Sequence, residues 1–371
     1  MLRDLTIQNY RCFKDFHIDG LARVNLIVGM NNIGKTSLLE AVYLFVNRGA
    51  PQCLADLLNN RGEFIEQFKD YNPMTGEPLR HINYAAGHIF YDHQATLEQI
   101  ICFKSTTESY PVLRIYLQHS DLQDSSAQKL SETETNPLGL IFKSGANIIT
   151  IPINYDGSIS SKAFQSFRLP SKLVNLFPKS SQFITNRSLF LTTNNLNFEQ
   201  LAALWNSITL TPKEDKVIDA LRILEPSLER ISFTSSATFN SGILVRLRDQ
   251  YPIPLGSMGE GMRRILNLAI AAVTVENGFL LVDEIETGLY YETQTDMWRF
   301  ILEVAQQLNI QVFATTHSWD CISAFQEALE QLEDKSVGKL FRLSRKGENI
   351  RAVDYPAEKL GVAVRQSIEV R

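Results

Sequence analysis

Short apolar runs alternate with longer amphipathic stretches along the last third of the chain. Apolar residues recur at helical spacing in Met262–Val275, Glu292–Leu308 and Ser318–Leu332, which predicts three helices. Apolar-rich runs at Phe279–Val282 and Gln311–Thr315 predict buried strands between these helices. Because strands that alternate with helices usually pair side by side, this order predicts a mostly parallel α/β sheet.

The start of the chain shows the same strand–helix pattern after two shorter strands. Alternating positions predict strands at Leu2–Ile7 and Phe13–Ile18, around the turn Asn9-Tyr10-Arg11. The β-branched run Val24–Val28 predicts a buried strand, and Lys35–Val46 predicts the helix that follows it. A glycine-containing turn therefore separates a strand from a helix.

The middle of the chain is more polar and less regular. Prolines and a glycine interrupt residues 49–82, which predicts a connecting insertion, and the polar residues 119–137 predict an exposed loop. Short strands are predicted at His88–Tyr91, Leu97–Lys104, Val112–Leu117, Leu140–Phe142, Ile148–Asn154, Leu228–Phe233 and Ile243–Leu247. Helices are predicted at Ala163–Phe167, Ser171–Phe177, Glu199–Ile208 and Lys213–Leu224, with prolines between them.

These elements divide the chain into three expected parts. Residues 1–155 would form the N-terminal part of the main lobe with antiparallel strands, residues 156–230 a helical subdomain, and residues 231–371 the C-terminal part. Gly338–Val353 is expected to form two strands at the end. We find neither an internal repeat nor a long heptad tract, so the sequence predicts no coiled-coil arms.

Composition narrows the class of protein. The chain has 371 residues, 44% of them hydrophobic and 21% charged, which is typical of a globular protein. Its net charge of −5 does not indicate a nucleic-acid-binding protein, although a chain with this charge can still carry a local basic strip. The four cysteines are scattered and form no Cys-x-x-Cys pair, which predicts free thiols in a reducing compartment. The chain has no long apolar run and no signal-peptide pattern. We therefore expect a cytoplasmic protein without a membrane span.

The first candidate site is the turn Gly29-Met-Asn-Asn-Ile-Gly-Lys-Thr36. It matches G-x-x-x-x-G-K-[ST], the phosphate-binding P-loop, and it lies between a predicted strand and a predicted helix as that motif requires. Backbone N–H groups and the helix dipole would face the phosphates. Lys35 would reach the β- and γ-phosphates, and the Thr36 hydroxyl would bind Mg²⁺.

Three further motifs follow late in the chain. Asp283 and Glu284 end an apolar strand, where Asp283 would hold Mg²⁺ and Glu284 would polarise the attacking water. His317 closes the next strand and could bond the γ-phosphate or that water. Ser257-Met-Gly-Glu-Gly261 precedes a helix and could bind an anion. Taken singly, each motif also has a plainer explanation: an exposed acidic pair at a strand end, a capping or surface histidine, and a plain helix-capping loop.

The order of these motifs resembles the ATP-binding-cassette class of ATPases: Walker A, signature, Walker B and switch histidine. In particular the chain is similar to the OLD-like (overcoming-lysogenization-defect) and RecF-like group, on Leu5–Phe13 and on Asp283–Leu289. The resemblance covers roughly residues 1–48 and 240–330. It implies a P-loop NTPase fold of ABC-ATPase type, a mixed sheet flanked by helices with an antiparallel β subdomain and a helical insertion.

The resemblance also implies a homodimer with ATP at the interface, or a higher oligomer. The loop Ser257–Gly261 would then contact the ATP held by the other subunit. The resulting site list is Gly29, Asn31, Asn32, Gly34, Lys35, Thr36, Ser37, Ser257, Gly259 and Glu260 for ATP, Thr36 and Asp283 for Mg²⁺, and Lys35, Glu284 and His317 for catalysis.

Two departures from the family pattern matter. The signature reads Ser-Met-Gly-Glu-Gly, and the glutamine of the usual Mg²⁺ loop has no clear counterpart, since Gln182 is a poor candidate. Arg187 could approach a phosphate but fits an ordinary surface arginine better. The tail has no D-x-D pair, so a TOPRIM nuclease domain is not expected within the chain.

The function expected from the resemblance is a nucleotide-gated ATPase switch of a bacterial anti-phage defence system. It would control a separate effector, a TOPRIM or HNH-like nuclease. Three alternatives stay open: a RecF-like DNA-repair ATPase, a transporter's nucleotide-binding subunit, and a scaffold that binds ATP with little hydrolysis. A basic strip would favour repair, and measured turnover would separate the scaffold from the switch.

Overall fold

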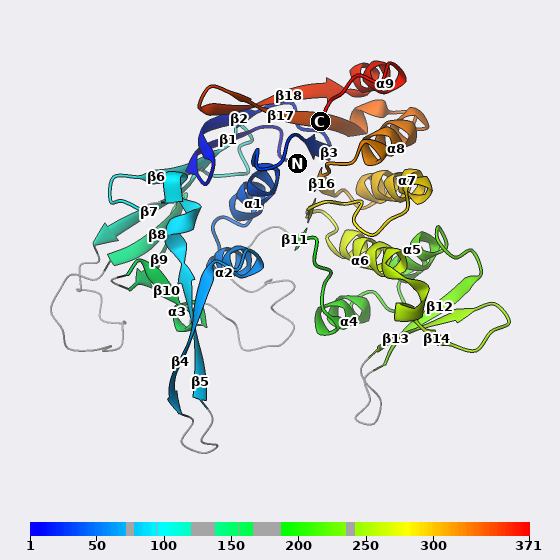
Figure 1. The fold of residues 1–371 in the computed structure, drawn as a ribbon, viewed down its shortest axis with the longest axis horizontal. Helices are drawn as coiled ribbons and strands as arrows, with labels where there is room; N and C mark the ends of the chain where they lie inside the picture. Colours follow the sequence, from blue (N-terminus) through cyan, green and yellow to red (C-terminus); the bar gives the residue numbers. More distant parts are fainter. Residues whose placement is uncertain (72–77, 94, 120–137, 155, 166–186, 235–241) are drawn as a thin grey trace.

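The structure is a computed structural model. It describes residues 1–71, 78–93, 95–119, 138–154, 156–165, 187–234 and 242–371 (Figure 1). The predicted helix Ser171–Phe177, the exposed loop over 119–137 except His119, and Gln182 lie outside the described residues.

A six-stranded sheet runs through the middle of the molecule. Its strands in spatial order are β11 (Ser188–Leu191), β15 (Phe279–Val282), β16 (Gln311–Thr315), β3 (Val24–Val28), β17 (Gly338–Lys346) and β18 (Asn349–Pro356). All neighbouring pairs are parallel except β17 and β18, which are antiparallel. The carboxyl ends of five strands therefore meet at one edge of the sheet.

Both faces of this sheet are buried, each in its own hydrophobic core. In β15, Leu280 and Val282 belong to one core, while Phe279 and Leu281 belong to the other. This alternation follows from the two-residue period of a strand. A strand that is apolar on both faces is the signature of a sheet covered on both sides.

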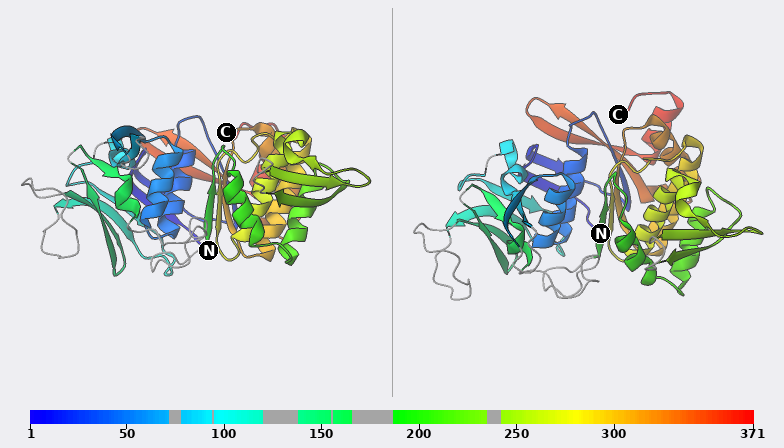
Figure 2. Two further views of the ribbon diagram at one scale, coloured as in Figure 1. Left: turned by 90° about the horizontal axis from the view of Figure 1, so that it is seen from below. Right: turned by 60° about the horizontal axis from the view of Figure 1, so that its bottom comes forward.

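Helices cover the face of the sheet to which Leu280 and Val282 belong. They are α4 (Phe198–Asn206), α5 (Pro212–Leu221), α6 (Glu260–Thr274), α7 (Tyr291–Gln307), α8 (Trp319–Glu330) and α9 (Ala357–Arg365). A small antiparallel sheet of β12 (Leu228–Thr234), β13 (Gly242–Leu247) and β14 (Ile253–Pro254) lies beyond α5. Figure 2 shows α6 to α8 on one side of the central strands and α1 on the other.

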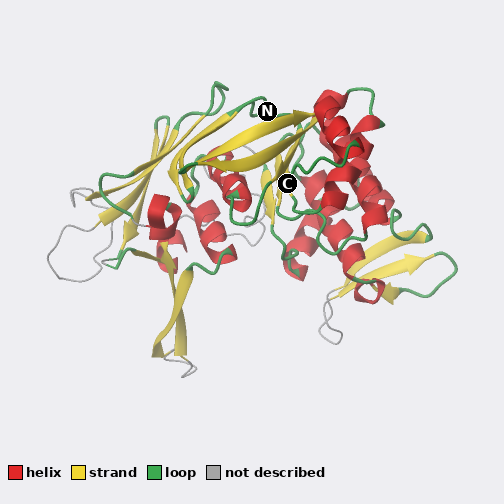
Figure 3. Ribbon diagram, turned by 45° about the horizontal axis from the view of Figure 1, so that its top comes forward, coloured by secondary structure: helices red, strands yellow, loops and turns green. Residues whose placement is uncertain are grey.

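The second face packs against two helices and an antiparallel sheet. The helices are α1 (Lys35–Val46) and α2 (Pro51–Asn60). The sheet has the order β2 (Phe13–Ile18), β1 (Leu5–Tyr10), β6 (Ile100–Lys104), β7 (Leu113–His119), β8 (Leu138–Ser144) and β9 (Asn147–Ile153). A projecting hairpin of β4 (Phe64–Tyr71) and β5 (Pro78–Ala85) pairs with β10 (Ser158–Ser160), next to α3 (Ser161–Gln165) (Figure 1). Figure 3 shows how strands dominate this side and helices the other.

Several predictions from the sequence need correction. Residues 49–82 are more than a connection, because Pro51 starts helix α2, six of whose ten residues are buried. His88–Tyr91 is not a strand: Ala86–Ile89 forms a 3-10 turn whose His88 and Ile89 carbonyls accept hydrogen bonds from Arg11.

The segment 156–230 is not wholly helical. Its strand β11 pairs with β15 inside the central sheet, and α4 and α5 pack into the same core as α6. The mixed α/β architecture with an antiparallel β part is as predicted. None of the described helices is long and apolar enough to cross a membrane.

Candidate functional site

The P-loop turn is built so that only glycine fits at two of its positions. Gly29 has φ +148° and Gly34 has φ +102°, a range that L side chains rarely adopt. A Cβ on Gly29 would lie 2.8 Å from the Leu343 carbonyl oxygen, and one on Gly34 would lie 2.6 Å from the Cys12 sulfur. The turn is therefore pressed against β17 and the β1–β2 connection, with the N-terminus of α1 open toward solvent at Asn31 and Asn32.

Lys35 begins α1 and folds back over the turn. Its ammonium group donates to the carbonyl oxygens of Gly29 at 2.8 Å and Met30 at 3.1 Å. Burial lowers the pKa of Lys35, and the nearby carboxylates of Asp283, Glu284 and Glu286 partly oppose that shift. The Lys35 ammonium group thus lies inside the loop, near the carboxylates of Asp283, Glu284 and Glu286, which follow a different strand.

Asp283 follows β15 at the same edge of the sheet. Its carboxylate accepts one hydrogen bond from the Thr36 hydroxyl at 2.9 Å and another from the Thr315 hydroxyl at 2.5 Å. Hard oxygen donors of this kind suit Mg²⁺, which usually takes one or two protein ligands and keeps waters and phosphates as the rest.

Glu284, Glu286 and His317 form the other half of this edge. The His317 Nδ1 lies 3.6 Å from Glu284 Oε1 and 3.7 Å from Glu286 Oε1. The two carboxylates differ in their surroundings: the Glu284 side chain is 39% exposed, whereas Glu286 is 9% exposed and accepts from the Thr316 hydroxyl at 2.7 Å. Glu284 is the acid that can reach a solvent molecule.

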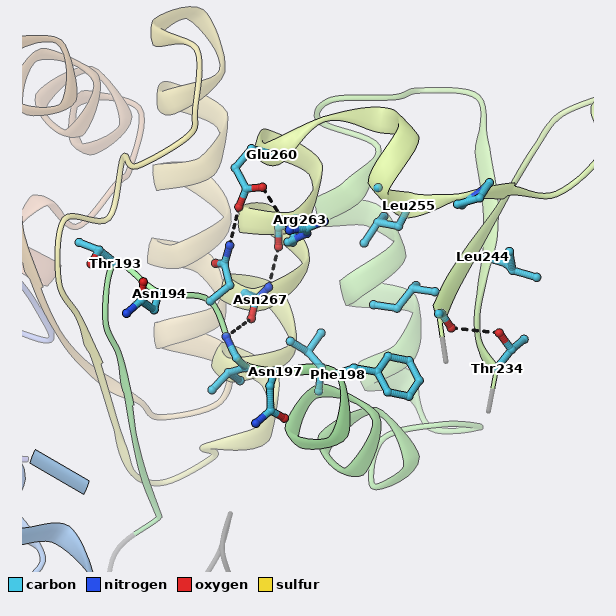
Figure 4. A pocket seen from close by; sticks show the side chains of 17 residues that line it. Thr193, Asn194, Asn197, Phe198, Thr234, Leu244, Leu255, Glu260, Arg263 and Asn267 are labelled. Atoms are coloured by element: carbon cyan, nitrogen blue, oxygen red, sulfur yellow. Dashed lines mark hydrogen bonds and ion pairs between the residues drawn. The ribbon is translucent and has the colours of Figure 1, made fainter. Parts of the chain in front are cut away.

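The signature loop leads into α6, whose first residues pack against Gly288. Its 3-10 turn Leu255–Met258 leads into α6 through Gly259, which has φ +90°. Ser257, Gly259 and Glu260 are exposed. Figure 4 shows Glu260 and Asn267 on α6 beside the loop after β11, and both line a cavity of about 1290 Å³. The Asn195 amide donates to Glu260 at 2.7 Å, so this loop and α6 are joined.

The structure thus brings together Lys35, Thr36, Asp283, Glu284 and His317, as the sequence predicts. It places others elsewhere. Ser37 is buried and its hydroxyl accepts from the Arg61 guanidinium at 3.2 Å, on the side of α2. The Arg187 carbonyl accepts from the first residue of β15, so this arginine lies at the opposite edge from the P-loop.

Three residues at this edge were given no role from the sequence. The Thr315 hydroxyl bonds the Asp283 carboxylate and the Glu284 backbone N–H. Glu286 accepts a hydrogen bond from the Thr316 hydroxyl, just before His317. Arg264 of α6 bonds the backbone of the acidic turn, the segment Asp283–Gly288 that follows β15. In the sequence, these three residues differ from their surroundings only in being polar residues next to or within apolar segments. Chemically, a cation, a helix N-terminus and carboxylates around one turn suit a polyphosphate with a divalent ion.

Comparison with known proteins finds one matching family model and several similar proteins. The family model described as the AAA ATPase domain matches residues 1–322. An ATP/GTP phosphatase of Helicobacter pylori is 23% identical over 375 residues, covering 97% of each chain. The DNA replication and repair protein RecF of Oenococcus oeni is 30% identical over 76 residues, 20% of this chain and 19% of that protein. The Smc head domain of the Pyrococcus furiosus complex with the C-terminal domain of ScpA superposes with a TM-score of 0.46 at 12% identity, covering 99% of both chains.

Proposed function

The chain belongs to the family of AAA ATPase domains, and from that premise we propose that it hydrolyses ATP at the edge of the central sheet. The observation that carries the proposal is the convergence of the P-loop lysine with the acid pair and the late histidine. Thr36 bonds Asp283 although 247 positions separate them, and His317 lies 3.6 Å from Glu284. Similarity to an ATP/GTP phosphatase along nearly the whole chain supports hydrolysis over binding alone.

Each residue has a separate part in this proposal. The loop amides and Lys35 neutralise phosphate charge, and Thr36 with Asp283 holds Mg²⁺, which would polarise the phosphates. Glu284 accepts a proton from the attacking water, and His317 donates a hydrogen bond toward the γ-phosphate. Fixed charges of this kind supply most of the rate gain in phosphoryl transfer.

We further propose that two copies close around ATP. Two exposed surfaces support this: the P-loop tip, where Met30 is 76% exposed, and the signature residues Ser257 and Gly259. In a head-to-head pair, the signature loop of one copy would complete the phosphate site of the other. Hydrolysis would then let the two copies part, which makes the protein a nucleotide-gated switch, with higher oligomers built from such pairs.

The biological setting rests on the resemblance in the sequence. It favours the cytoplasmic ATPase subunit of a bacterial anti-phage defence complex that controls a TOPRIM or HNH-like nuclease on another chain. Co-purification of the tagged protein with the product of a neighbouring gene tests this setting. A nuclease partner supports it, and a recombination protein contradicts it.

One alternative has an observation of its own. The short similarity to RecF favours a DNA-repair ATPase, although the net charge of −5 does not. Double-stranded DNA binding that weakens steeply with salt would support that alternative. A transporter's nucleotide-binding subunit and an ATP-binding scaffold with little hydrolysis are the remaining candidates.

The test compares three purified variants with the wild type. Lys35→Ala should lose nucleotide binding, because it removes the cation from the loop. Glu284→Gln should keep binding, lose turnover by about 100-fold or more, and accumulate as an ATP-bound dimer. Glu348→Gln, whose side chain is 84% exposed, is the control. Wild-type turnover in Glu284→Gln would remove this residue from the mechanism.

A further inference from the structure

Arg264 is the most buried charged side chain near the site. It belongs to the start of α6, and only 1% of its surface is exposed. Its guanidinium donates to three backbone carbonyl oxygens: Thr192 at 3.0 Å, Asp283 at 3.0 Å and Glu284 at 2.9 Å. Among the described residues it forms no ion pair with a carboxylate.

These carbonyls belong to the ends of two neighbouring strands. Thr192 follows β11, and Asp283 with Glu284 follows β15. A planar guanidinium with donors in a fixed fork suits such a set, whereas lysine offers a single point charge with rotatable donors on a flexible stem. Burial lowers the pKa of Arg264, which the acids Glu286, Asp283 and Glu284 partly oppose. Because burying a charged side chain costs free energy, we infer that the three hydrogen bonds of Arg264 have a role in the site.

The same face of α6 holds the loop after β11 at two more points. Glu260 accepts from the Asn195 amide at 2.7 Å, and Asn267 accepts from the Leu196 backbone N–H at 2.9 Å. Residues 260, 264 and 267 lie on one side of a helix, since they are four and three positions apart. At the start of α6, a Cβ on Gly261 would lie 3.1 Å from the Gly288 carbonyl oxygen, so the acidic turn itself packs there.

Glu284 has an unusual backbone conformation that these contacts stabilise. Its φ of +46° is in the left-handed region, which is costly for a residue with a side chain. Its N–H donates to the Thr315 hydroxyl at 2.9 Å, and its carbonyl accepts from Arg264. The peptide groups on both sides of Glu284 are thus fixed, and with them the point at which its side chain leaves the backbone; the carboxylate lies 3.6 Å from His317 Nδ1.

We propose that Arg264 is a positioning residue that makes the orientation of Glu284 depend on the position of the signature helix α6. The inference rests on the proposed function, in which the loop before α6 contacts the nucleotide of a second copy. Closure of the pair would then set Glu284 in its own subunit through Arg264. Each subunit would be ready for hydrolysis only when its signature loop is engaged.

Two substitutions test the inference, with a matched control. Arg264→Gln and Arg264→Lys should leave affinity for a non-hydrolysable ATP analogue within about twofold and lower kcat about 10- to 100-fold, with the lysine variant less affected. Arg23→Gln is the control, because Arg23 also donates to the carbonyls of Ala305 and Ile310 but lies at the opposite edge of the sheet. It should lower the thermal midpoint without changing kcat.

A mixed dimer shows through which subunit Arg264 acts. Arg264→Gln is co-expressed with Glu284→Gln under two tags, and the doubly tagged dimer is assayed. If Arg264 acts on Glu284 of its own subunit, neither site of the mixed dimer is intact and turnover stays at the level of the variants. Recovery of about half the wild-type rate would mean that Arg264 serves the partner's nucleotide, which overturns the inference.

Other outcomes are also decisive. Wild-type kcat in both Arg264 variants would overturn the inference, and so would loss of analogue affinity together with kcat, which indicates a purely structural residue. Absence of ATP turnover in the wild-type protein would instead overturn the proposed function, and the inference with it.

Discussion

Thr315→Val is the substitution whose effect follows most directly from the geometry of the site. Thr315 is fully buried at the end of β16. Its hydroxyl donates to Asp283 Oδ1 at 2.5 Å and accepts from the Glu284 N–H at 2.9 Å. Valine has nearly the shape of threonine, so the change removes two hydrogen bonds while most of the packing stays.

The expected loss of stability comes from both bonds. A hydrogen bond to a charged carboxylate contributes about 1.5–3 kcal/mol, and a buried N–H left without a partner costs about 1–3 kcal/mol. Together we expect a loss of about 2.5–6 kcal/mol in the free energy of unfolding. Turnover should also fall, because the carboxylate proposed to hold Mg²⁺ loses one of its two hydroxyl partners.

Two further variants serve as controls. Thr315→Ser keeps the hydroxyl and should recover most of the stability and turnover. Thr274→Val removes a buried hydroxyl that bonds only carbonyls of its own helix, at 2.8 and 3.0 Å, and should cost less than about 1 kcal/mol. Urea unfolding followed by tryptophan fluorescence measures the differences. Equal midpoints for the two valine variants, with wild-type turnover, would refute this reasoning.

Three other substitutions or conditions give further expectations. Gly34→Ala should lower nucleotide affinity more than tenfold, because its φ of +102° and the Cys12 sulfur exclude a Cβ; calorimetry showing wild-type affinity would contradict this. Arg371→Ala should lower kcat about two- to fivefold without changing the thermal midpoint, since Arg371 donates to the His317 carbonyl at 3.2 Å but is itself exposed. Burial lowers the pKa of Lys35 in the free protein and phosphate should raise it again, so binding takes up a proton and ATP affinity falls as the pH rises through the lowered pKa. Calorimetry in buffers of different ionisation enthalpy measures that uptake, and its absence at alkaline pH would exclude this linkage.

The elements predicted best are those whose signal is local. The P-loop turn needs glycines at fixed positions, and β15 is apolar on both faces, so both can be found in the sequence. Pro51 shows the limit of a local rule. A proline usually indicates an interruption, but at the first position of a helix it has no hydrogen bond to lose and its fixed φ suits the helix.

Elements that depend on distant partners were missed. Strand β11 has four residues, and its identity comes from pairing with β15, about 90 positions away. His88–Tyr91 is apolar enough for a strand, but the turn around Arg11 uses its carbonyls instead. In the site, Lys35 and Asp283 follow from motifs, whereas Thr315 and Arg264 act through contacts that only the folded chain creates.

The acidic turn shows why composition alone does not assign its three carboxylates. Asp283 is bonded by two hydroxyls, one of them from the P-loop helix, which suits a metal ligand. Glu286 is almost fully buried and bonds the Thr316 hydroxyl and the His317 backbone, which suits a structural support. Asp283 and Glu284 are both partly exposed, but hydroxyls bond the Asp283 carboxylate, whereas the Glu284 carboxylate lies beside the imidazole of His317 on a backbone fixed from both sides. A general base needs access to water and an oxygen that can take its proton, and among these acids Glu284 combines partial exposure with a carboxylate to which neither Thr36 nor Thr315 donates.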